Sequence, residues 1–357
     1  MPAFTFVDQP DRIATQFEQY SIIGVDTEFM RERTFFSQLC LVQLSTGDEI
    51  YCVDPLSGQE TNSFWRSVDT CTWVLHSARQ DIEVIYQTAG FMPAAIFDTQ
   101  IAAGLLGFAP QMGYAGLIKE LFDVDLAKSH TRANWTTRPL PEEYLQYAAE
   151  DVEYLLPAYE ELSSRLDKLG RREWAEFDSH LLLDTELYDI DPNKAISRLK
   201  GARNLRGQKR AAAARLAAWR EMQATQRDRP RQWIVRDNLL MDIACQLPAS
   251  VSALAKIDGM PPKLVQRAGD DIVAAVNEAA NDKSDYRPPG APDDVQKSVL
   301  KNMQALVAEC ANDLGIAAET IASKKELAAV IASGDRHSRV FQGWRKKLVG
   351  DALAALL

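Results

Sequence analysis

The sequence predicts an α/β domain followed by two all-α domains, and three observations lead to this fold class. Strand-like and helix-like segments alternate over about the first 160 residues, which is the pattern of an α/β layer architecture. Beyond that point the strand signals disappear, and Ala, Leu, Arg and Glu recur with helical periodicity. Two segments rich in turn-forming residues, 184–204 and 281–292, separate these parts of the chain.

Short apolar runs mark the expected strands of the first half, at 22–25, 39–44, 50–53, 73–75 and 95–97. Gly47 and Asp48 form a turn between the second and third runs, so the first three are expected to pair as an antiparallel meander. A helix is expected over 79–89 and should end at Gly90, and further helices should follow up to residue 159.

The second half is expected to contain helices alone, as over 210–222 and 270–279. Asp293 can cap a helix that runs to Leu314 and ends before Gly315, which places the start of the last domain near residue 290. The chain of 357 residues is long enough for several domains with cores of their own. The expected domains are 1–200, with linker helices from about 160, then 205–285 and 290–357.

Composition excludes several classes of protein. The hydrophobic content of 46% and charged content of 25% are those of folded globular chains and exclude a disordered class. The longest apolar stretch, 94–110, contains Asp98 and is shorter than the roughly 18 to 20 residues that span a bilayer. The N-terminus lacks the order of a secretory signal. We therefore expect a cytoplasmic protein without a membrane segment, whose five scattered cysteines are buried thiols.

Positive charge is concentrated in one segment, although the net charge is −10. Residues 198–236 contain twelve basic and two acidic residues, including Arg203, Arg206 and Arg210. Such a segment can bind a polyanion such as RNA. The alternative is a solvated helix face, because Ala-rich helices often carry arginine.

Two acids, Asp26 and Glu28, follow directly on the apolar run at 22–25. Side chains two apart on a strand share one face, so both carboxylates converge on one point. Convergent carboxylates are costly without a cation, and their hard oxygen atoms suit Mg²⁺ or Mn²⁺. Taken alone the motif is weak, because an acid-x-acid pattern recurs by chance in a chain this acidic.

Further acids follow later in the chain. Asp81 lies in the first turn of the helix expected over 79–89, where an acid can simply stabilise the helix dipole. Tyr147 and Asp151 lie four apart on a later helix and project from one face, which is also the pattern of an ordinary surface pair. Neither motif identifies a site by itself, and only the order of the acids along the chain is informative.

That order resembles the DEDDy branch of the DnaQ-like exonucleases, which have a ribonuclease-H-like fold with a mixed sheet and helices on both faces. The flanking residues 29–36, 39–43 and 134–140 are similar to those of the ribonuclease D family. The helices within 205–285 resemble an HRDC domain, and 321–357 resembles a second, divergent copy. The resemblance covers nearly the whole chain and implies a 3′-to-5′ exoribonuclease that releases nucleoside 5′-monophosphates.

The resemblance also implies roles for particular residues. Two divalent metal ions, Mg²⁺ or Mn²⁺, would be held by Asp26, Glu28, Asp81 and Asp151, and would activate water for attack on the phosphodiester. Tyr147 would orient that water, because a phenol with a pKa near 10 is a poor base at neutral pH. The implied partner is RNA, such as precursor transfer RNA and other small structured RNAs, bound by a monomer.

Several neighbours are weaker candidates for binding the substrate. Phe29 and Met30 could stack on the terminal base or pack in the core. His76 could contact phosphate or serve as a structural histidine. By analogy with the family, Gln43, Trp135 and Arg138 could border the RNA channel, and Arg203, Arg206 and Arg210 could hold RNA from the basic segment.

Two other functions remain to be considered. A non-catalytic RNA-binding module on a decayed nuclease fold would have no physical reason to retain four mutually repelling carboxylates. A DNA exonuclease would use the same acids, and only the resemblance to paired HRDC-like domains argues against it.

Overall fold

The structure of the chain is a computed structural model that describes residues 2–126, 133–281 and 293–357. The chain divides into two compact units. Unit 1 comprises Met1–Met30, Gln38–Tyr188 and Ala291–Leu357, and unit 2 comprises Arg31–Ser37 and Asp189–Gly290. Apart from residue 281, the linker expected over 281–292 lies outside the described residues. Among the described helices, none is both long and apolar enough to cross a membrane.

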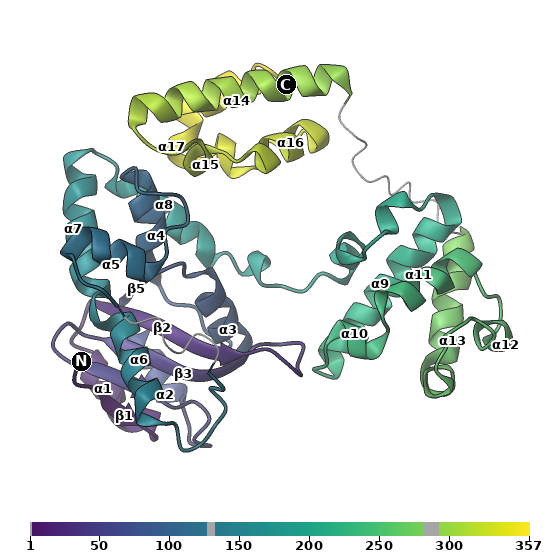
Figure 1. The fold of residues 1–357 in the computed structure, drawn as a ribbon, viewed down its shortest axis with the longest axis horizontal. Helices are drawn as coiled ribbons and strands as arrows, with labels where there is room; N and C mark the ends of the chain where they lie inside the picture. The colour runs from purple at the N-terminus through teal and green to yellow at the C-terminus, as the bar shows by residue number, and fades with distance from the viewer. Residues whose placement is uncertain (1, 127–132, 282–292) are drawn as a thin grey trace. The chain divides into compact units, whose positions relative to one another are not determined.

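Unit 1 is built on a six-stranded mixed sheet with the strand order β1-β4-β3-β2-β5-β6. Figure 1 labels strands β1, β2, β3 and β5 of this sheet. Strands β2, β3 and β4 form the expected antiparallel meander, and β1, β5 and β6 join it through parallel pairs. The strands are β1 (Thr5–Val7), β2 (Ile22–Met30), β3 (Gln38–Ser45), β4 (Ile50–Val53), β5 (Thr72–Leu75) and β6 (Ala95–Asp98).

The observed strands differ from the expected ones in two respects. Strand β1 was not predicted, because its three residues are too few to show a period. The acids were expected at the end of a strand, whereas β2 continues beyond them to Met30 because β3 stays paired with it across a bulge between Glu28 and Phe29. Backbone pairing with β3 therefore holds Asp26 and Glu28 in place.

Helices pack on both faces of the sheet, as the fold class predicted. One face buries Val25 and Val42 under the helices α1 (Ala14–Phe17), α2 (Asn62–Val68) and α3 (Arg79–Ala89). The other buries Leu41 and Cys52 under α6 (Glu142–Glu153), and its core extends through α4 (Thr99–Leu105), α5 (Tyr114–Phe122), α7 (Leu155–Lys168) and α8 (Arg172–His180). The helix expected over 79–89 is confirmed and ends at Gly90 in the left-handed conformation.

The C-terminal segment of unit 1 is helical. Its longest helix begins with a capping box at Asp293 and ends at the left-handed Gly315, as predicted from those residues. Buried side chains such as Met303 and Val307 belong to the same hydrophobic cluster as Leu41 in the sheet. The elements are α14 (Asp294–Leu314), α15 (Ala318–Ile321), α16 (Lys324–Ser333), α17 (Gly343–Arg345), a π-helical turn (Lys346–Gly350) and α18 (Asp351–Ala354).

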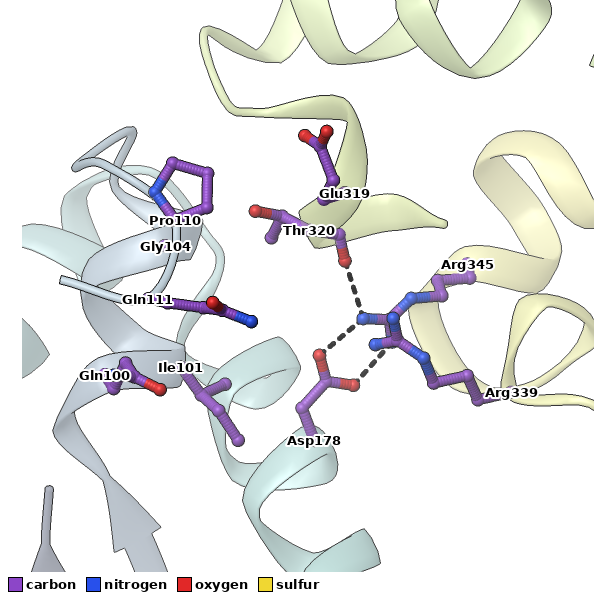
Figure 2. Close-up of a pocket in the computed structure, with 10 residues that line it drawn as sticks. All are labelled: Gln100, Ile101, Gly104, Pro110, Gln111, Asp178, Glu319, Thr320, Arg339 and Arg345. Atoms are coloured by element: carbon purple, nitrogen blue, oxygen red, sulfur yellow. Dashed lines mark hydrogen bonds and ion pairs between the residues drawn. The ribbon is translucent and has the colours of Figure 1, made fainter. Parts of the chain in front are cut away.

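A buried ion pair fastens this segment to α8 (Figure 2). Asp178 accepts hydrogen bonds from Nη1 and Nη2 of Arg345 at 2.5 and 2.7 Å, and from Nε1 of Trp344 at 3.1 Å. Arg345 also donates to the Thr320 carbonyl at 2.8 Å. The rings of Trp344 and Trp174 stack with centroids 4.6 Å apart. We call these residues of α8 and α17 the Asp178 clamp.

Unit 2 is a bundle of helices around a core of its own. The loop Arg31–Ser37 belongs to it, and Phe35 is buried in the core, where its backbone N–H donates to Asp228 at 2.9 Å. Every described residue after β6 lies outside strands, so the expected change to helices is confirmed. The helices are α9 (Gly207–Gln226), α10 (Arg231–Ile234), α11 (Asp237–Gln246), α12 (Val251–Leu254) and α13 (Pro262–Glu278).

Candidate active site

Strand β2 places Asp26 and Glu28 on one face of the sheet. Thr27 between them points to the opposite face and is buried. In the register with β3, Asp26 lies opposite Gln43 and Glu28 lies opposite Leu41. Both acids are partly exposed, so a ligand can reach them from solvent.

Helix α6 brings Asp151 and Tyr147 to the same face. The helix follows Pro141, and it buries Ala148 and Ala149 against the sheet, where small side chains allow a close approach. Residues four apart share one helical face, so Tyr147 and Asp151 project together. One carboxylate oxygen from each of Asp26, Glu28 and Asp151 lies within 4.8 Å of the other two.

Asp81 reaches the cluster from the first turn of α3. Its side chain is 7% exposed and accepts a hydrogen bond of 2.6 Å from the Thr27 hydroxyl, so β2 itself orients it. It is not one of the three acids that share the 4.8 Å separation, but its charge raises the pKa of both Asp26 and Glu28. The acids of β2 and the acid of α3 therefore act on the same small volume.

Burial raises the pKa of every acid in the cluster, and repulsion between its carboxylates raises the pKa of Asp26 and of Glu28 further. The pKa of Asp26 lies well above its usual range because of burial first, and then because of the neighbouring carboxylates. Burial, followed by the charges of Asp151 and Asp81, raises the pKa of Glu28 to about 8. Burial also raises the pKa of Asp81 and of Asp151 to about 7. Without a cation, the cluster thus retains protons near neutral pH.

Tyr147 is a hydrogen-bond donor in this site. Burial, and then the charges of Asp151 and Glu28, raise the pKa of its hydroxyl far above the usual range. The hydroxyl is bonded to Asp151 and lowers the pKa of that acid. A phenol that keeps its proton can orient a water or a carboxylate, but it cannot act as a base at neutral pH.

These residues fit a divalent cation. Three carboxylates within 4.8 Å of one another supply hard oxygen atoms, and their raised pKa values show an excess of negative charge that a cation would neutralise. A bound cation would also displace the retained protons, because carboxylates ligate metals in their ionised form. The carboxylate cluster therefore fits the predicted metal site, which stays a prediction.

The structure corrects three of the expected RNA contacts. Gln43 is fully buried, and Trp135 is 3% exposed with its ring 6.4 Å from that of Tyr147. Arg138 donates to both oxygens of Asp54, and its remaining N–H groups are bonded to backbone carbonyls. Gln43 and Trp135 are thus buried, and Arg138 is engaged by partners within the fold, so these side chains do not border a channel. Sequence patterns near the acids do not distinguish buried from exposed positions.

The basic segment carries less free charge than its composition indicates. Arg210 is 5% exposed and donates to the Ala202 carbonyl, so it is corrected from an RNA contact to a structural residue. Arg203 and Arg206 are exposed and remain candidates. Other cations of the segment form ion pairs within unit 2, namely Arg198 and Arg231 with Glu221, Arg220 with Asp237, and Arg215 with Glu278.

Three other candidates have mixed environments. His76 is held through both ring nitrogens, which lie 2.9 Å from the Thr99 hydroxyl and from the Met112 carbonyl, so a phosphate would have to displace one of them. Burial lowers the pKa of this histidine. Phe29 and Met30 are partly exposed while packing against the cores on opposite faces of the sheet, so their role in stacking stays a prediction.

Sequence reasoning missed two aromatic residues. Tyr114 begins α5, its hydroxyl accepts the Tyr154 N–H at 3.0 Å, and the charges of Asp151 and Asp26 raise its pKa after burial does. No local spacing connects it to the acids. Trp233 of unit 2 is 57% exposed. Its position among arginines in the basic segment was the available signal.

All five cysteines are free thiols. Cys40, Cys52 and Cys71 are buried as expected, whereas Cys245 and Cys310 are partly exposed.

The sequence matches two family models. Residues 3–167 match a family described as 3′-5′ exonuclease, and residues 209–276 match the HRDC domain. The first covers the sheet and the four acids, and the second lies within unit 2.

Similar proteins extend the match to nearly the whole chain. A ribonuclease D of Pseudomonas paraeruginosa is 36% identical over 341 residues, which cover 93% of this chain and 90% of the relative. A ribonuclease D of Xanthomonas oryzae pv. oryzae is 34% identical, with coverage of 94% and 93%. The crystal structure of Escherichia coli RNase D superposes with a TM-score of 0.89 at 27% identity, covering 100% of this chain and 99% of that one. The chain belongs to the ribonuclease D family of 3′-5′ exoribonucleases.

Proposed function

We propose that this protein shortens RNA from its 3′ end and releases nucleoside 5′-monophosphates, with two divalent metal ions, Mg²⁺ or Mn²⁺, in the acidic cluster. The observation that carries the proposal is the convergence of Asp26, Glu28 and Asp151 within 4.8 Å, next to Asp81. When bound, a pair of cations supplies an activated water and neutralises charge on the phosphate. Asp26 on β2 and Asp151 on α6 would hold this pair from two sides.

Tyr147 has a defined part in this proposal. Its hydroxyl keeps its proton and is bonded to Asp151. It would position the attacking water by hydrogen bonding, while the carboxylates set the geometry around it. Asp81, oriented by the hydrogen bond from Thr27, would be a further ligand of the metal site.

The substrate is proposed to be precursor transfer RNA and other small structured RNAs, acted on in the cytoplasm by a monomer. The relatives support RNA as the substrate, because they are ribonucleases D. We retain 1–200, 205–285 and 290–357 as proposed domains. The first contains the acids, while the others supply helical surfaces that can hold RNA.

Unit 2 offers a surface suited to single-stranded RNA. A groove of about 870 Å³ is lined by Trp233, Arg236, Lys263 and Arg267, together with Asp242 and Asp258. The Arg229 guanidinium lies 5.9 Å from the Trp233 ring. Within the described part of the chain, none of the four cations forms an ion pair; they are Arg229, Arg236, Lys263 and Arg267. An exposed indole among free cations can stack on a base while the cations contact phosphates.

The proposal is tested by incubating the protein with a 3′-extended structured RNA in Mg²⁺ or Mn²⁺. The wild type should release mononucleotides from the 3′ end, and Asp26→Ala or Asp151→Ala should lose at least about 10³-fold in rate, because each removes a ligand of the metal site. Glu161→Ala, at an exposed ion pair on α7, serves as the control. Equal release by the wild type and by both variants of the acids would show that the assigned site is wrong.

A further inference from the structure

A buried amide lies beside the acidic cluster. Gln43 of β3 is 0% exposed and is the direct register partner of Asp26 on β2. In an antiparallel pair, directly opposed side chains lie on the same face with Cβ atoms roughly 4.5 to 5.5 Å apart. Gln43 therefore points to the face that carries the acids, beneath α6.

The surroundings of Gln43 do not satisfy its amide. Its other cross-strand neighbour is Cys52 of β4, and the thiol of Cys52 is directed to the Leu145 carbonyl of α6. Neither Oε1 nor Nε2 of Gln43 has a hydrogen-bond partner among the residues that the structure describes. Buried amides almost always have partners, so an exception requires an explanation.

Packing alone gives no reason for an amide at this position. A buried amide without a partner destabilises a fold, and an apolar side chain of similar volume would fill the same space without that cost. Leu41 and Cys52, the neighbours on this face, are of that kind. The nearest polar group by register is the carboxylate of Asp26.

We propose that Gln43 is a positioning residue for Asp26: when a divalent cation is bound, Nε2 of Gln43 donates a hydrogen bond to the Asp26 carboxylate. The proposal rests on the metal site of the proposed function. A donor behind a metal ligand fixes the orientation of that ligand. Gln43 would thus act on the metal without contacting it.

The proposal separates two properties that ordinary core residues lose together. Replacing Gln43 by an apolar residue removes the unsatisfied amide, so the metal-free protein should become more stable. The same replacement removes the donor behind Asp26, so metal affinity should fall. A purely structural glutamine would lower stability when replaced and leave metal affinity unchanged.

The test compares Gln43→Met and Gln43→Leu with Cys52→Ala. Cys52 neighbours Gln43 on the same face but lies one strand further from Asp26. Cys52→Ala therefore creates a packing defect in the same core and leaves the residues next to Asp26 unchanged. Thermal unfolding is measured in EDTA, and Mn²⁺ binding to the full chain is measured by titration calorimetry. Asp26→Asn provides the reference for a damaged metal site. None of these measurements requires RNA hydrolysis.

We expect both Gln43 variants to unfold about 2 to 6 °C higher in EDTA. We expect their Mn²⁺ affinity to fall by about tenfold or more, whereas Cys52→Ala keeps the wild-type affinity and unfolds at a lower temperature. Unchanged Mn²⁺ affinity in both Gln43 variants would overturn the proposal. An equal loss of affinity in Cys52→Ala would also overturn it, as would lower melting temperatures for both Gln43 variants. If the wild type binds Mn²⁺ but does not degrade RNA, the proposed function is wrong. The Mn²⁺ affinities and melting temperatures of the Gln43 variants still test the role of Gln43 in that case.

Discussion

At the scale of single residues, the site is dominated by acids that are costly to bring together. Asp26, Glu28 and Asp151 lie close together and partly buried, and repulsion from neighbouring carboxylates raises the pKa of Asp26 and of Glu28. Hydrogen bonds from Thr27 and Tyr147 offset part of this cost at Asp81 and Asp151. The cluster is therefore held together by the surrounding fold and by any cation that binds it, because its own charges oppose it.

The stability of the metal-free protein should depend on pH in a defined direction. The folded-state pKa of Asp81 and of Asp151 is about 7 and that of Glu28 about 8, above the values near 4 of an unfolded chain. In this window the folded state binds more protons, so stability is highest at its acidic end and falls as pH rises toward 8. The melting temperature in EDTA should drop between pH 5.5 and 8.

Two comparisons identify the source of that change. Mn²⁺ should raise the melting temperature more at pH 8 than at pH 5.5, because it replaces protons on the acids. Asp151→Asn should flatten the profile by removing one titrating group. His76, whose pKa burial lowers, acts in the opposite direction as a single group. A melting temperature that rises with pH in EDTA would contradict the repulsion described for the acids.

Replacing Tyr147 by phenylalanine tests its role as a donor. Tyr147→Phe removes the hydrogen bond to Asp151 while keeping the ring. The turnover rate should fall by about 10² to 10⁴, the usual contribution of a positioned proton-bearing group. Mn²⁺ affinity should change little, since all four carboxylates remain. A rate equal to that of wild type would show that the hydroxyl has no part in the reaction.

At the scale of elements, the important contacts join parts of the chain that lie far apart in the sequence. Helix α6 carries Asp151 to strand β2, and Thr27 of β2 bonds Asp81 of α3. The Asp178 clamp joins α8 to α17 more than 160 residues later. These contacts explain why unit 1 contains the C-terminal helices as well as the sheet.

The Asp178 clamp should contribute strongly to the stability of unit 1. Asp178→Ala leaves the buried Arg345 guanidinium without its carboxylate, and removing one partner of such a pair costs about 3 to 5 kcal/mol. Chemical denaturation should show this loss, and limited proteolysis should cut the C-terminal helices first. The control is Glu161→Ala, at an exposed pair with Arg165, which should cost about 1 kcal/mol or less. Equal stability of both variants would contradict the clamp.

The groove of unit 2 should bind single-stranded RNA through Trp233. Trp233→Ala should weaken binding by about 1 to 3 kcal/mol, the range for stacking of one base. Arg236→Ala and Lys263→Ala should reduce the salt dependence of binding. Arg215, whose guanidinium pairs with Glu278, provides a control for loss of an engaged cation. Fluorescence anisotropy with a labelled oligoribonucleotide measures both effects, and wild-type affinity and salt slope in Trp233→Ala and Lys263→Ala would exclude this groove.

At the scale of the whole molecule, acidic and basic side chains of the proposed sites lie in different units. The net charge is −10, yet the acids of the proposed metal site are gathered in unit 1 and several cations without ion pairs among the described residues lie in unit 2. Overall charge therefore says little about RNA binding in this protein. The acids of unit 1 suit a cation, and the cations of unit 2 suit the phosphates of RNA.

The sequence by itself determined the features that depend on local spacing. A period of two placed Asp26 and Glu28 on one face, a period of 3.6 placed Tyr147 and Asp151 together, and capping residues marked the ends of helices. Their order along the chain indicated the family before any contact was known. These features follow from backbone geometry, which neighbouring residues set.

Only the tertiary structure decided which side chains are buried and which distant residues meet. It brought Asp81 to Thr27, placed Gln43 beneath α6, and withdrew Arg210 from the surface. It also united the C-terminal helices with the sheet in one hydrophobic cluster. Burial and long-range pairing result from the packing of whole elements. A local sequence pattern does not show which distant element will pack against a given side chain.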